Sequence, residues 1–378
     1  MPVSVDRVLI VGGGIAGLST AIALRQIGVE HIDVLEINSN WSVYGVGIVQ
    51  AANAFRALER LGLAEAVLEA GWPMRGRRIH DRDGVVIDDF DTPSLVQGQF
   101  PPASGIARPA LHRVLKDGVR TAGVDVRLGV TVDAVESRTG GVEVELTDGT
   151  NGSYDLVVGA DGIRSQMRRR LLGDKFEPQY TGQVCWRYNV PRSDGLDRSW
   201  LFTGGRGKAG FIPLSETSMY ILLIENASPE EMSIAPAHLA EVFREHLASY
   251  GGPVGEVRDH HITDPAAVVY RPVEEVVVPE PWHRGRVVLV GDAVHATSPD
   301  LGQGSAMAYE DVIVLAECLA GDGTVEQQLG EYSRRRYPRA RLICDLSRQI
   351  QRVNMTNGPA EELVRLSRIA SEHVGAAP

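Results

Sequence analysis

The feature that most constrains the fold is a glycine-rich turn between a strand and a helix near the start of the chain. Arg7–Val11 is a short apolar run typical of a buried strand, and Leu18–Gln26 has the periodicity of a helix. The turn between them has the spacing Gly-x-Gly-x-x-Gly, with glycine at Gly12, Gly14 and Gly17. A second apolar run, Ile32–Leu35, follows and ends at Glu36. This order predicts a βαβ unit with parallel strands.

Each glycine of such a turn has its own role. Gly12 permits the tight turn, Gly14 lets a pyrophosphate approach the backbone, and Gly17 lets the helix pack on the strand. The start of the helix offers free amides and the positive end of its dipole. Glu36 stands about 20 residues beyond the turn, where an acid accepts from ribose hydroxyls. The unit predicts a bound dinucleotide, either FAD or NAD(P), and does not distinguish between them.

A second strand–turn–helix segment lies in the middle of the chain. The predicted strand Leu156–Ala160 ends at Asp161 and Gly162, and Ser165 is placed as the N-cap of the helix that follows. Taken alone, this segment is equally consistent with a structural turn and with a ligand site.

The third segment, Arg286–Asp311, ends a buried strand on a carboxylate. Asp292 follows the strand, and a loop containing Pro299, Gly302 and Gly304 then enters a helical pattern. A buried carboxylate is costly unless it is hydrogen-bonded, and closely spaced glycines leave the backbone uncovered. We therefore expect a bound ligand whose hydroxyl satisfies Asp292 and whose flat ring lies against the glycine backbone.

Together, the three motifs resemble those of the FAD-dependent aromatic hydroxylases in the para-hydroxybenzoate hydroxylase superfamily, nearest to its salicylate and urate hydroxylase-like branch. Members of that superfamily carry a dinucleotide turn, a later Asp-Gly motif and a still later Gly-Asp motif, in this order. The resemblance implies an FAD-dependent monooxygenase. It would use NADH or NADPH as a transient reductant and O2 to hydroxylate a small aromatic or N-heteroaromatic substrate, through a flavin C4a-hydroperoxide.

The resemblance also implies which residues bind FAD. Glu36 would hold the adenosine ribose, and Arg108 would reach the cofactor from a helix start. Val132 would meet the adenine side through its main chain, Asp161 would lie by the pyrophosphate, and Asp292 would accept from the ribityl chain. The other implied cofactor contacts are Gly12, Gly14, Ala16, Gly17, Val49, Gly162, Gly302, Gln303, Gly304, Ser305 and Ala306.

Two of these implied contacts have particular features. Gly45–Val49 resembles the mobile segment that lies beside the flavin ring in the superfamily. Ala306 stands where many members have asparagine, which makes the start of the flavin-contacting helix less polar without removing its amides.

Between the second and third motifs, short β-branched and aromatic runs alternate with turn residues and predict an antiparallel sheet. We expect an insertion at about Trp72–Phe100 to add strands to it. One face of this sheet would cover the flavin and the other would meet solvent, with an amphipathic helix at Pro236–Gly251 packed outside. The C-terminal stretch is expected to be helical, with breaks at Pro338 and Gly358.

The predicted fold is α/β, with a Rossmann-like FAD-binding domain interleaved with an antiparallel substrate-binding sheet and followed by C-terminal helices. We assign residues 1–72, 101–178 and 265–345 to a discontinuous FAD-binding domain. Residues 73–100 and 179–264 form the predicted sheet domain, and residues 346–378 the C-terminal helical segment.

The predicted sheet also supplies candidates for the substrate site. Cys185, Arg187, Tyr220 and Pro299 are the candidate substrate-binding residues. Asp300 and Tyr220 are the candidate catalytic residues, with Asp300 polarising a substrate hydroxyl through water. The purine-contacting arginine of the urate hydroxylases has no clear counterpart, because Lys208 and Ala209 occupy that neighbourhood, so the sequence does not favour urate.

Two other function classes stay open. A flavin-dependent halogenase shares this fold, and "WRYNVP" distantly resembles a halogenase strand, although no lysine near Gly45–Gln50 suits the halogenating role. A non-enzymatic flavin-binding protein is the second alternative, although the chain has no output domain.

Composition argues against several partners and sites. A net charge of −11 argues against nucleic acid, and no apolar run is long enough to span a membrane. The cysteines Cys185, Cys318 and Cys344 have no metal or redox spacing. His295, which we expect to bond loop carbonyls, and Asp259–His261 show no ligand spacing, so no metal is expected. We expect a cytoplasmic monomer or homodimer.

Overall fold

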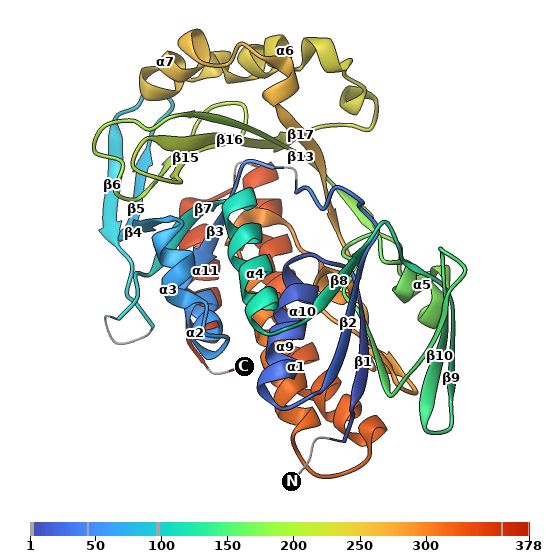
Figure 1. Cartoon of the computed structure of the whole chain (residues 1–378). Helices are drawn as coiled ribbons and strands as arrows, with labels where there is room; N and C mark the ends of the chain where they lie inside the picture. The colour runs from blue at the N-terminus through green and yellow to red at the C-terminus, as the bar shows by residue number, and fades with distance from the viewer. Residues whose placement is uncertain (1–3, 44, 96–98, 357, 377) are drawn as a thin grey trace.

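The computed structural model describes residues 4–43, 45–95, 99–356, 358–376 and 378. One layer is a six-stranded sheet near the lower part of Figure 1. In order across the sheet its strands are β18 (His283–Arg284), β19 (Val287–Leu289), β12 (Leu156–Gly159), β1 (Arg7–Val11), β2 (His31–Glu36) and β8 (Asp125–Leu128). β1 pairs in parallel with both β2 and β12, and β12 pairs in parallel with β19. The predicted βαβ unit and parallel sheet are confirmed.

Helices cover one face of this sheet, and a small antiparallel sheet lies against the other (Figure 1). The helices next to the sheet are α1 (Ile15–Gln26), α4 (Arg108–Thr121) and α9 (Gly304–Leu319). Farther from the sheet, α2 (Ala52–Arg60) packs against α9, and α3 (Ala64–Glu69) packs against α4. The small sheet consists of β9 (Val132–Arg138), β10 (Gly141–Leu146) and β11 (Asn151–Tyr154). The central strands of the six-stranded sheet are covered on both faces and are therefore apolar along their length. In β12, for example, every residue is buried.

The second large layer is a seven-stranded sheet. In order its strands are β17 (Val269–Glu275), β13 (Gln179–Pro191), β16 (Ser218–Asn226), β15 (Lys208–Pro213), β14 (Ser199–Phe202), β5 (Gly76–His80) and β6 (Val86–Asp91). All neighbours are antiparallel except β14 and β5, which are parallel. The expected insertion therefore does add strands to this sheet, although not all of it joins. Its first strand, β4 (Trp72–Met74), pairs instead with β7 (Ala103–Ala107), which also pairs with β3 (Gly47–Ala51).

The outer face of the seven-stranded sheet was expected to meet solvent, with one amphipathic helix packed outside it. The packed helix is present, but this face is more fully covered than expected. Helices α6 (Leu239–His246) and α7 (Gly252–His260) lie over it (Figure 1). Trp186 of the sheet stacks on Phe243 of α6, with ring centroids 5.2 Å apart. The expected helix at Pro236–Gly251 is interrupted, because short 3-10 turns precede and follow α6.

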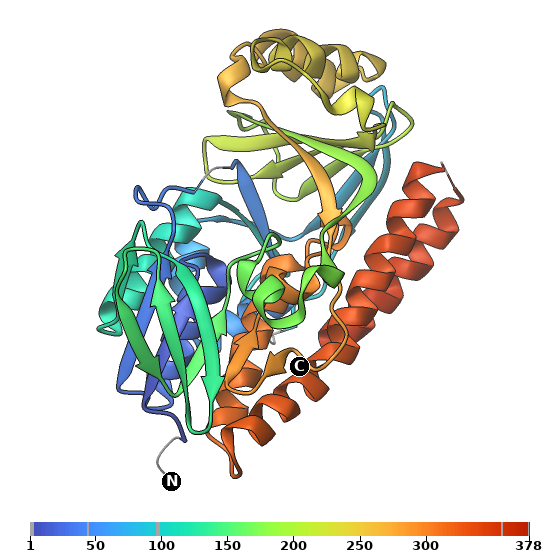
Figure 2. The same cartoon turned by 90° about the vertical axis from the view of Figure 1, so that its right-hand side faces the viewer.

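The C-terminal region forms two helices, α10 (Val325–Met355) and α11 (Ala360–Gly375), which run along one side of the molecule in Figure 2. The expected break at Gly358 is correct, since Gly358 lies between them. The expected break at Pro338 is wrong, because α10 continues through this residue. Proline costs the helix one hydrogen bond, and burial of neighbours such as Arg336 and Ala340 against α9 holds the helix together.

No helix in the described part of the chain combines the length and the apolar character needed to cross a membrane. The division of the chain into domains stays a prediction.

Candidate active site

The turn between β1 and α1 contains two glycines that close packing requires and one whose Cβ position is free of protein atoms. A β-carbon on Gly12 would lie 2.5 Å from the carbonyl oxygen of Ala160, and one on Gly17 would lie 1.8 Å from that of Gly12. A β-carbon on Gly14 would meet no atom within 4 Å. Gly14 is also the N-cap of α1, and no side chain caps the helix there. The backbone at Gly14 is thus accessible to a ligand, beside the positive end of the helix dipole.

Glu36 lies at the end of β2, directly beside this turn. One carboxylate oxygen accepts from the amide of Gly13 at 3.0 Å and the other from that of Asn38 at 2.7 Å. Each oxygen keeps a further lone pair with which to accept a ligand hydroxyl. Trp41, which was not predicted, donates to the carbonyl of Gly13 at 3.0 Å, and a ring nitrogen of His112 lies 3.4 Å from the same carbonyl. Neither residue stands in a motif, so spacing gave no signal for them.

The second motif starts helix α5 (Gln166–Leu172). Ser165 is its N-cap, as predicted, and accepts from the amide of Arg168 at 2.8 Å. Asp161 accepts from the Ser165 hydroxyl at 2.5 Å and from the Met167 amide at 3.0 Å. Asp161 therefore holds the start of α5, and Gly162, with φ near +77°, leaves its Cβ position open. The role of Asp161 beside a pyrophosphate stays a prediction.

Val132, the first residue of β9, is buried, and its carbonyl accepts from Arg170 at 3.2 Å. A contact to adenine through its main chain stays a prediction.

The third motif places Asp292 at the start of the short helix α8 (Asp292–His295), directly after β19. The expectation that Asp292 is buried was wrong, because its side chain is exposed at the carboxyl end of the sheet. Gly302 has φ near +64°, and neither Gly302 nor Gly304 would bring a β-carbon within 4 Å of another atom. The carboxylate and the uncovered backbone lie in one loop between β19 and α9.

Core packing and side-chain hydrogen bonds hold the first residues of α9 in place. Ala306 is fully buried, so its methyl group packs into the core where the superfamily often has an amide. Gln303 accepts from Asn53 at 2.9 Å, and Ser305 lies 3.5 Å from the side-chain oxygen of Gln50. Asn53 also donates to Glu310 at 3.0 Å.

A buried ion network lies under the same loop. His295 was expected to bond loop carbonyls, and this was wrong, because its Nε2 lies 2.5 Å from a carboxylate oxygen of Asp311. Asp311 also accepts from the amide of Gly291 at 2.9 Å and from Arg336 at 2.8 Å. Burial opposes charge on His295, but the adjacent Asp311 carboxylate outweighs it and raises the pKa of the imidazole. The network fixes the backbone just before Asp292.

The structure brings three sequence candidates together on the seven-stranded sheet. Arg187 and Cys185 on β13 face the same side as Tyr220 on β16, because Asn189 pairs with Tyr220 and Arg187 with Leu222. The Tyr220 ring contacts β3, where a β-carbon on Gly47 would lie 2.7 Å from it. Its hydroxyl has no hydrogen-bond partner among the described residues, and burial raises the pKa of this phenol.

Arg108 joins this group from the first position of α4, as predicted for its place at a helix start. Its stem lies against Gly45, whose β-carbon would be 2.6 Å from it. Desolvation lowers the pKa of Arg108, and the nearby charge of Arg187 lowers it further, while Asp292 raises it. Arg108 therefore lies near both large sheets, because Arg187 belongs to the seven-stranded sheet and Asp292 follows the parallel strand β19.

Pro299 and Asp300 form a 3-10 turn, Pro299–Leu301, before α9. The Asp300 carboxylate is fully buried and accepts from Lys208 at 2.9 Å, from Asn354 at 3.1 Å and from Ser298 at 3.0 Å. Both of its oxygens are engaged, so Asp300 links β15, the loop and α10. The contacts do not test the predicted catalytic role of Asp300, and they favour a positioning role instead.

These residues fit a flavin dinucleotide. The open Cβ positions of Gly14, Gly162, Gly302 and Gly304 lie in the three motif loops. Glu36, at the end of β2, lies beside the first of these loops, and Asp292 belongs to the third. Residues 6–347 match the family described as the FAD binding domain.

The chain belongs to this FAD-binding family.

Similar proteins cover most or nearly all of this family member. A putative FAD-dependent monooxygenase, YetM of Bacillus subtilis, is 32% identical over 95% of this chain and 96% of its own. The 2-heptyl-3-hydroxy-4(1H)-quinolone synthase of Pseudomonas aeruginosa is 34% identical over 83% of this chain and 81% of its own. The structure of Klebsiella pneumoniae HpxO complexed with FAD and uric acid has a TM-score of 0.81 at 27% identity, covering 98% of this chain and 93% of that one. The resemblance to FAD-dependent hydroxylases, the fold class and the FAD cofactor are confirmed.

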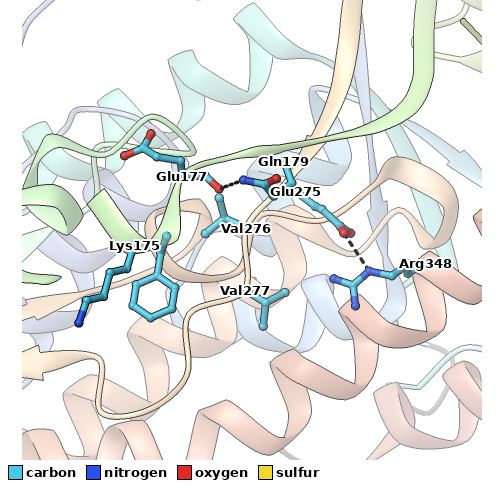
Figure 3. Close-up of a pocket in the computed structure, with 8 residues that line it drawn as sticks. Lys175, Glu177, Gln179, Glu275, Val276, Val277 and Arg348 are labelled. Carbon is cyan, nitrogen blue, oxygen red and sulfur yellow. Dashed lines mark hydrogen bonds and ion pairs between the residues drawn. The ribbon is translucent and has the colours of Figure 1, made fainter. Parts of the chain in front are cut away.

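A pocket of about 280 Å³ lies away from the flavin motifs of this family (Figure 3). It is lined by Lys175, Phe176, Glu177, Gln179, Glu275, Val276, Val277 and Arg348. No predicted site residue lines it. Its Glu275 and Arg348 are paired at 2.8 Å, which ties the end of β17 to α10 (Figure 3). We interpret the pocket as a recess beside the segments that connect the two large sheets.

Proposed function

We propose that this flavoprotein uses NADH or NADPH and O2 to hydroxylate a small aromatic or N-heteroaromatic compound. The observation that carries the proposal is the meeting of Asp292, after the last parallel strand, with Arg108, Arg187 and Tyr220 at the face of the second sheet. Ligands of α/β folds bind at the carboxyl ends of parallel strands, and here Arg108 lies near both Asp292 at that edge and Arg187 and Tyr220 of the second sheet. The names of the relatives add support. One is a putative FAD-dependent monooxygenase, one is a quinolone synthase, and one is a protein in complex with FAD and uric acid.

FAD, when bound, supplies the redox chemistry, accepting a hydride from the nicotinamide and activating dioxygen. The proposed task of this chain is to hold it. Glu36 accepts from the adenosine ribose, Asp292 accepts from the ribityl chain, and Arg108 reaches the cofactor from the start of α4. The open backbone at Gly302 and Gly304 and the positive end of α9 would lie against the ring and stabilise negative charge on it.

The proposed substrate wall consists of Cys185, Arg187 and Tyr220 from the sheet and Pro299 from the loop before α9. The free hydroxyl of Tyr220 orients the ring by a hydrogen bond to a polar substituent. Asp300 acts in this proposal as a positioning residue, because its ion pair with Lys208 holds the Pro299 turn against β15.

The test is a screen of aromatic and N-heteroaromatic acids, phenols and amides with the purified flavoprotein. We expect at least one compound to stimulate NADH or NADPH oxidation and to yield a product that carries one oxygen atom from labelled O2. Hydrogen peroxide is measured in parallel, because its formation in place of product indicates uncoupling. The proposal is contradicted if flavin-loaded protein gives no oxygenated product across the screen. A chlorinated product formed in the presence of chloride would instead support the halogenase alternative.

A further inference from the structure

The side chain of Asn53 joins helix α2 to the loop that precedes α9. Asn53 is the second residue of α2, and α2 packs against α9. Its Nδ2 donates to Oε1 of Gln303 at 2.9 Å and to Oε1 of Glu310 at 3.0 Å. All three side chains are buried. Gln303 is the N-cap of α9 and lies between Gly302 and Gly304, whose Cβ positions are open.

The position of the Glu310 carboxylate is fixed by three arginines. Arg339 donates to both of its oxygens, at 2.7 and 2.6 Å. Arg336 and Arg56 lie at ion-pair distances of 3.1 and 3.7 Å from it. Arg56 and Arg339 also donate to backbone carbonyls at the end of α11. Glu310 is therefore held from α2, α10 and α11 as well as by its own helix.

This carboxylate dictates how the Asn53 amide is turned. An ionised carboxylate only accepts hydrogen bonds, so Asn53 must direct its NH2 group toward Glu310, and the reverse orientation would place Oδ1 against the carboxylate. The same NH2 group serves Gln303, which must therefore present its oxygen. Charge at Glu310 thus sets the orientation of two amides in succession.

The orientation leaves the nitrogen of the Gln303 amide free. Oxygen and nitrogen lie on opposite sides of an amide carbon, so Nε2 of Gln303 is directed away from Asn53. Within the described part of the chain this nitrogen donates to no other residue, and it is not among the enclosed side-chain atoms that lack a partner. A hydrogen-bond donor that a ligand can reach therefore stands beside the open backbone of Gly302 and Gly304.

We propose that Asn53 and Glu310 are positioning residues that orient the Gln303 amide, so that Gln303 donates from Nε2 to an acceptor atom of the flavin ring of bound FAD. A donor fixed in advance stabilises the reduced, more electron-rich ring without reorganisation of the protein. The inference goes beyond the proposed function, because it concerns the cofactor and holds whichever compound is hydroxylated.

The test is a double-mutant cycle measured without substrate. FAD titration gives the dissociation constant, and reductive titration of the loaded protein gives the flavin midpoint potential. Asn53→Ala and Gln303→Ala should each raise the dissociation constant about three- to tenfold and lower the potential, because the oriented donor is lost. The double variant should match Gln303→Ala, since Asn53 acts through Gln303.

A control variant separates this role from general stability. Gln328→Ala also removes a buried amide that donates once, to the carbonyl of Gly321 near the start of α10. It should unfold more easily than the wild type but keep the FAD dissociation constant and the midpoint potential.

Gln303→Glu tests the donor directly and decides the matter if Asn53→Ala does not fold. It keeps an oxygen that accepts from Asn53 and replaces the NH2 group by a second, negatively charged oxygen. FAD should bind at least about tenfold more weakly than to the wild type, a larger loss than in Gln303→Ala, and the midpoint potential should fall further.

Four results would overturn the inference. Asn53→Ala could leave FAD affinity and potential unchanged, or keep its full effect in the Gln303→Ala background. Gln303→Glu could bind FAD as tightly as the wild type. Gln328→Ala could lose as much FAD affinity as Asn53→Ala, which would show that affinity follows stability alone. The proposed function fails by a different result, namely flavin-loaded protein that forms no oxygenated product from any compound.

Discussion

At position 14 a methyl group would meet no protein atom, whereas at position 17 it would collide with the backbone of Gly12. Gly14→Ala should therefore fold with a stability within about 1 kcal/mol of the wild type but bind FAD at least tenfold more weakly, because the methyl group occupies the path of the pyrophosphate. Gly17→Ala should lose several kcal/mol of stability, on the order of an overpacked core substitution. Thermal unfolding and FAD titration of both variants separate the two effects, and equal FAD affinity in Gly14→Ala and wild type would refute the assignment.

The Asp300 carboxylate offers a second residue-scale prediction. Both of its oxygens accept hydrogen bonds, so it has little capacity left to take a proton from a substrate. Asp300→Asn should retain hydroxylation within about threefold in kcat while losing roughly 1–3 kcal/mol of stability, because Lys208 is left without its counter-charge. Steady-state kinetics and thermal unfolding measure the two quantities. A loss of two orders of magnitude in kcat with unchanged stability would show that Asp300 is catalytic.

At the scale of elements, local sequence patterns predicted correctly those helices and turns whose structure depends mainly on neighbouring residues. The strand–turn–helix unit around Gly12 was predicted because tight turns and helix periodicity are local properties. Pro338 was misjudged because α10 is held by packing against α9, which no local pattern reports. The exposure of Asp292 and the pairing of His295 with Asp311 were also missed. Both depend on how β19, α9 and α10 come together, and these elements meet only in the folded chain.

The network around His295 predicts how stability depends on pH. The pKa of His295 is raised above its ordinary value of 6.5, so its contribution is complete below that value and is lost as pH rises through the raised pKa. The pKa of Asp311 is lowered from 3.8, although burial opposes this, so its contribution is complete above that value and is lost as pH falls through the lowered pKa. Arg336 and Asp292 also act on His295, with opposite signs.

His295→Gln should therefore cost roughly 3–5 kcal/mol of unfolding free energy near pH 6, where the ion pair is complete. The cost should shrink as pH rises above the raised pKa of His295. Denaturant unfolding of both proteins across this range measures the difference. A cost that grows with rising pH would contradict the charged pair.

At the scale of the whole molecule, the acidic chain places Arg108 and Arg187, whose charges would attract an anionic ligand, near the loop that follows β19. Figure 2 shows the two large sheets between which this loop lies. Charge attraction of this kind is screened by salt. The affinity for an aromatic acid should fall about three- to tenfold between 0.05 and 0.5 M salt, while the affinity for its amide stays nearly constant. Titrations at several salt concentrations measure this, and equal salt dependence for acid and amide would contradict it.

The most direct test is a titration of flavin-free protein with FAD, followed by the quenching of flavin fluorescence. We expect saturation at one FAD per chain, with affinity lost in Gly14→Ala and kept in the surface variant Arg138→Gln. Folded protein that takes up no FAD, or that binds it equally well in Gly14→Ala, would contradict a cofactor held between the glycine turn of β1 and the start of α9.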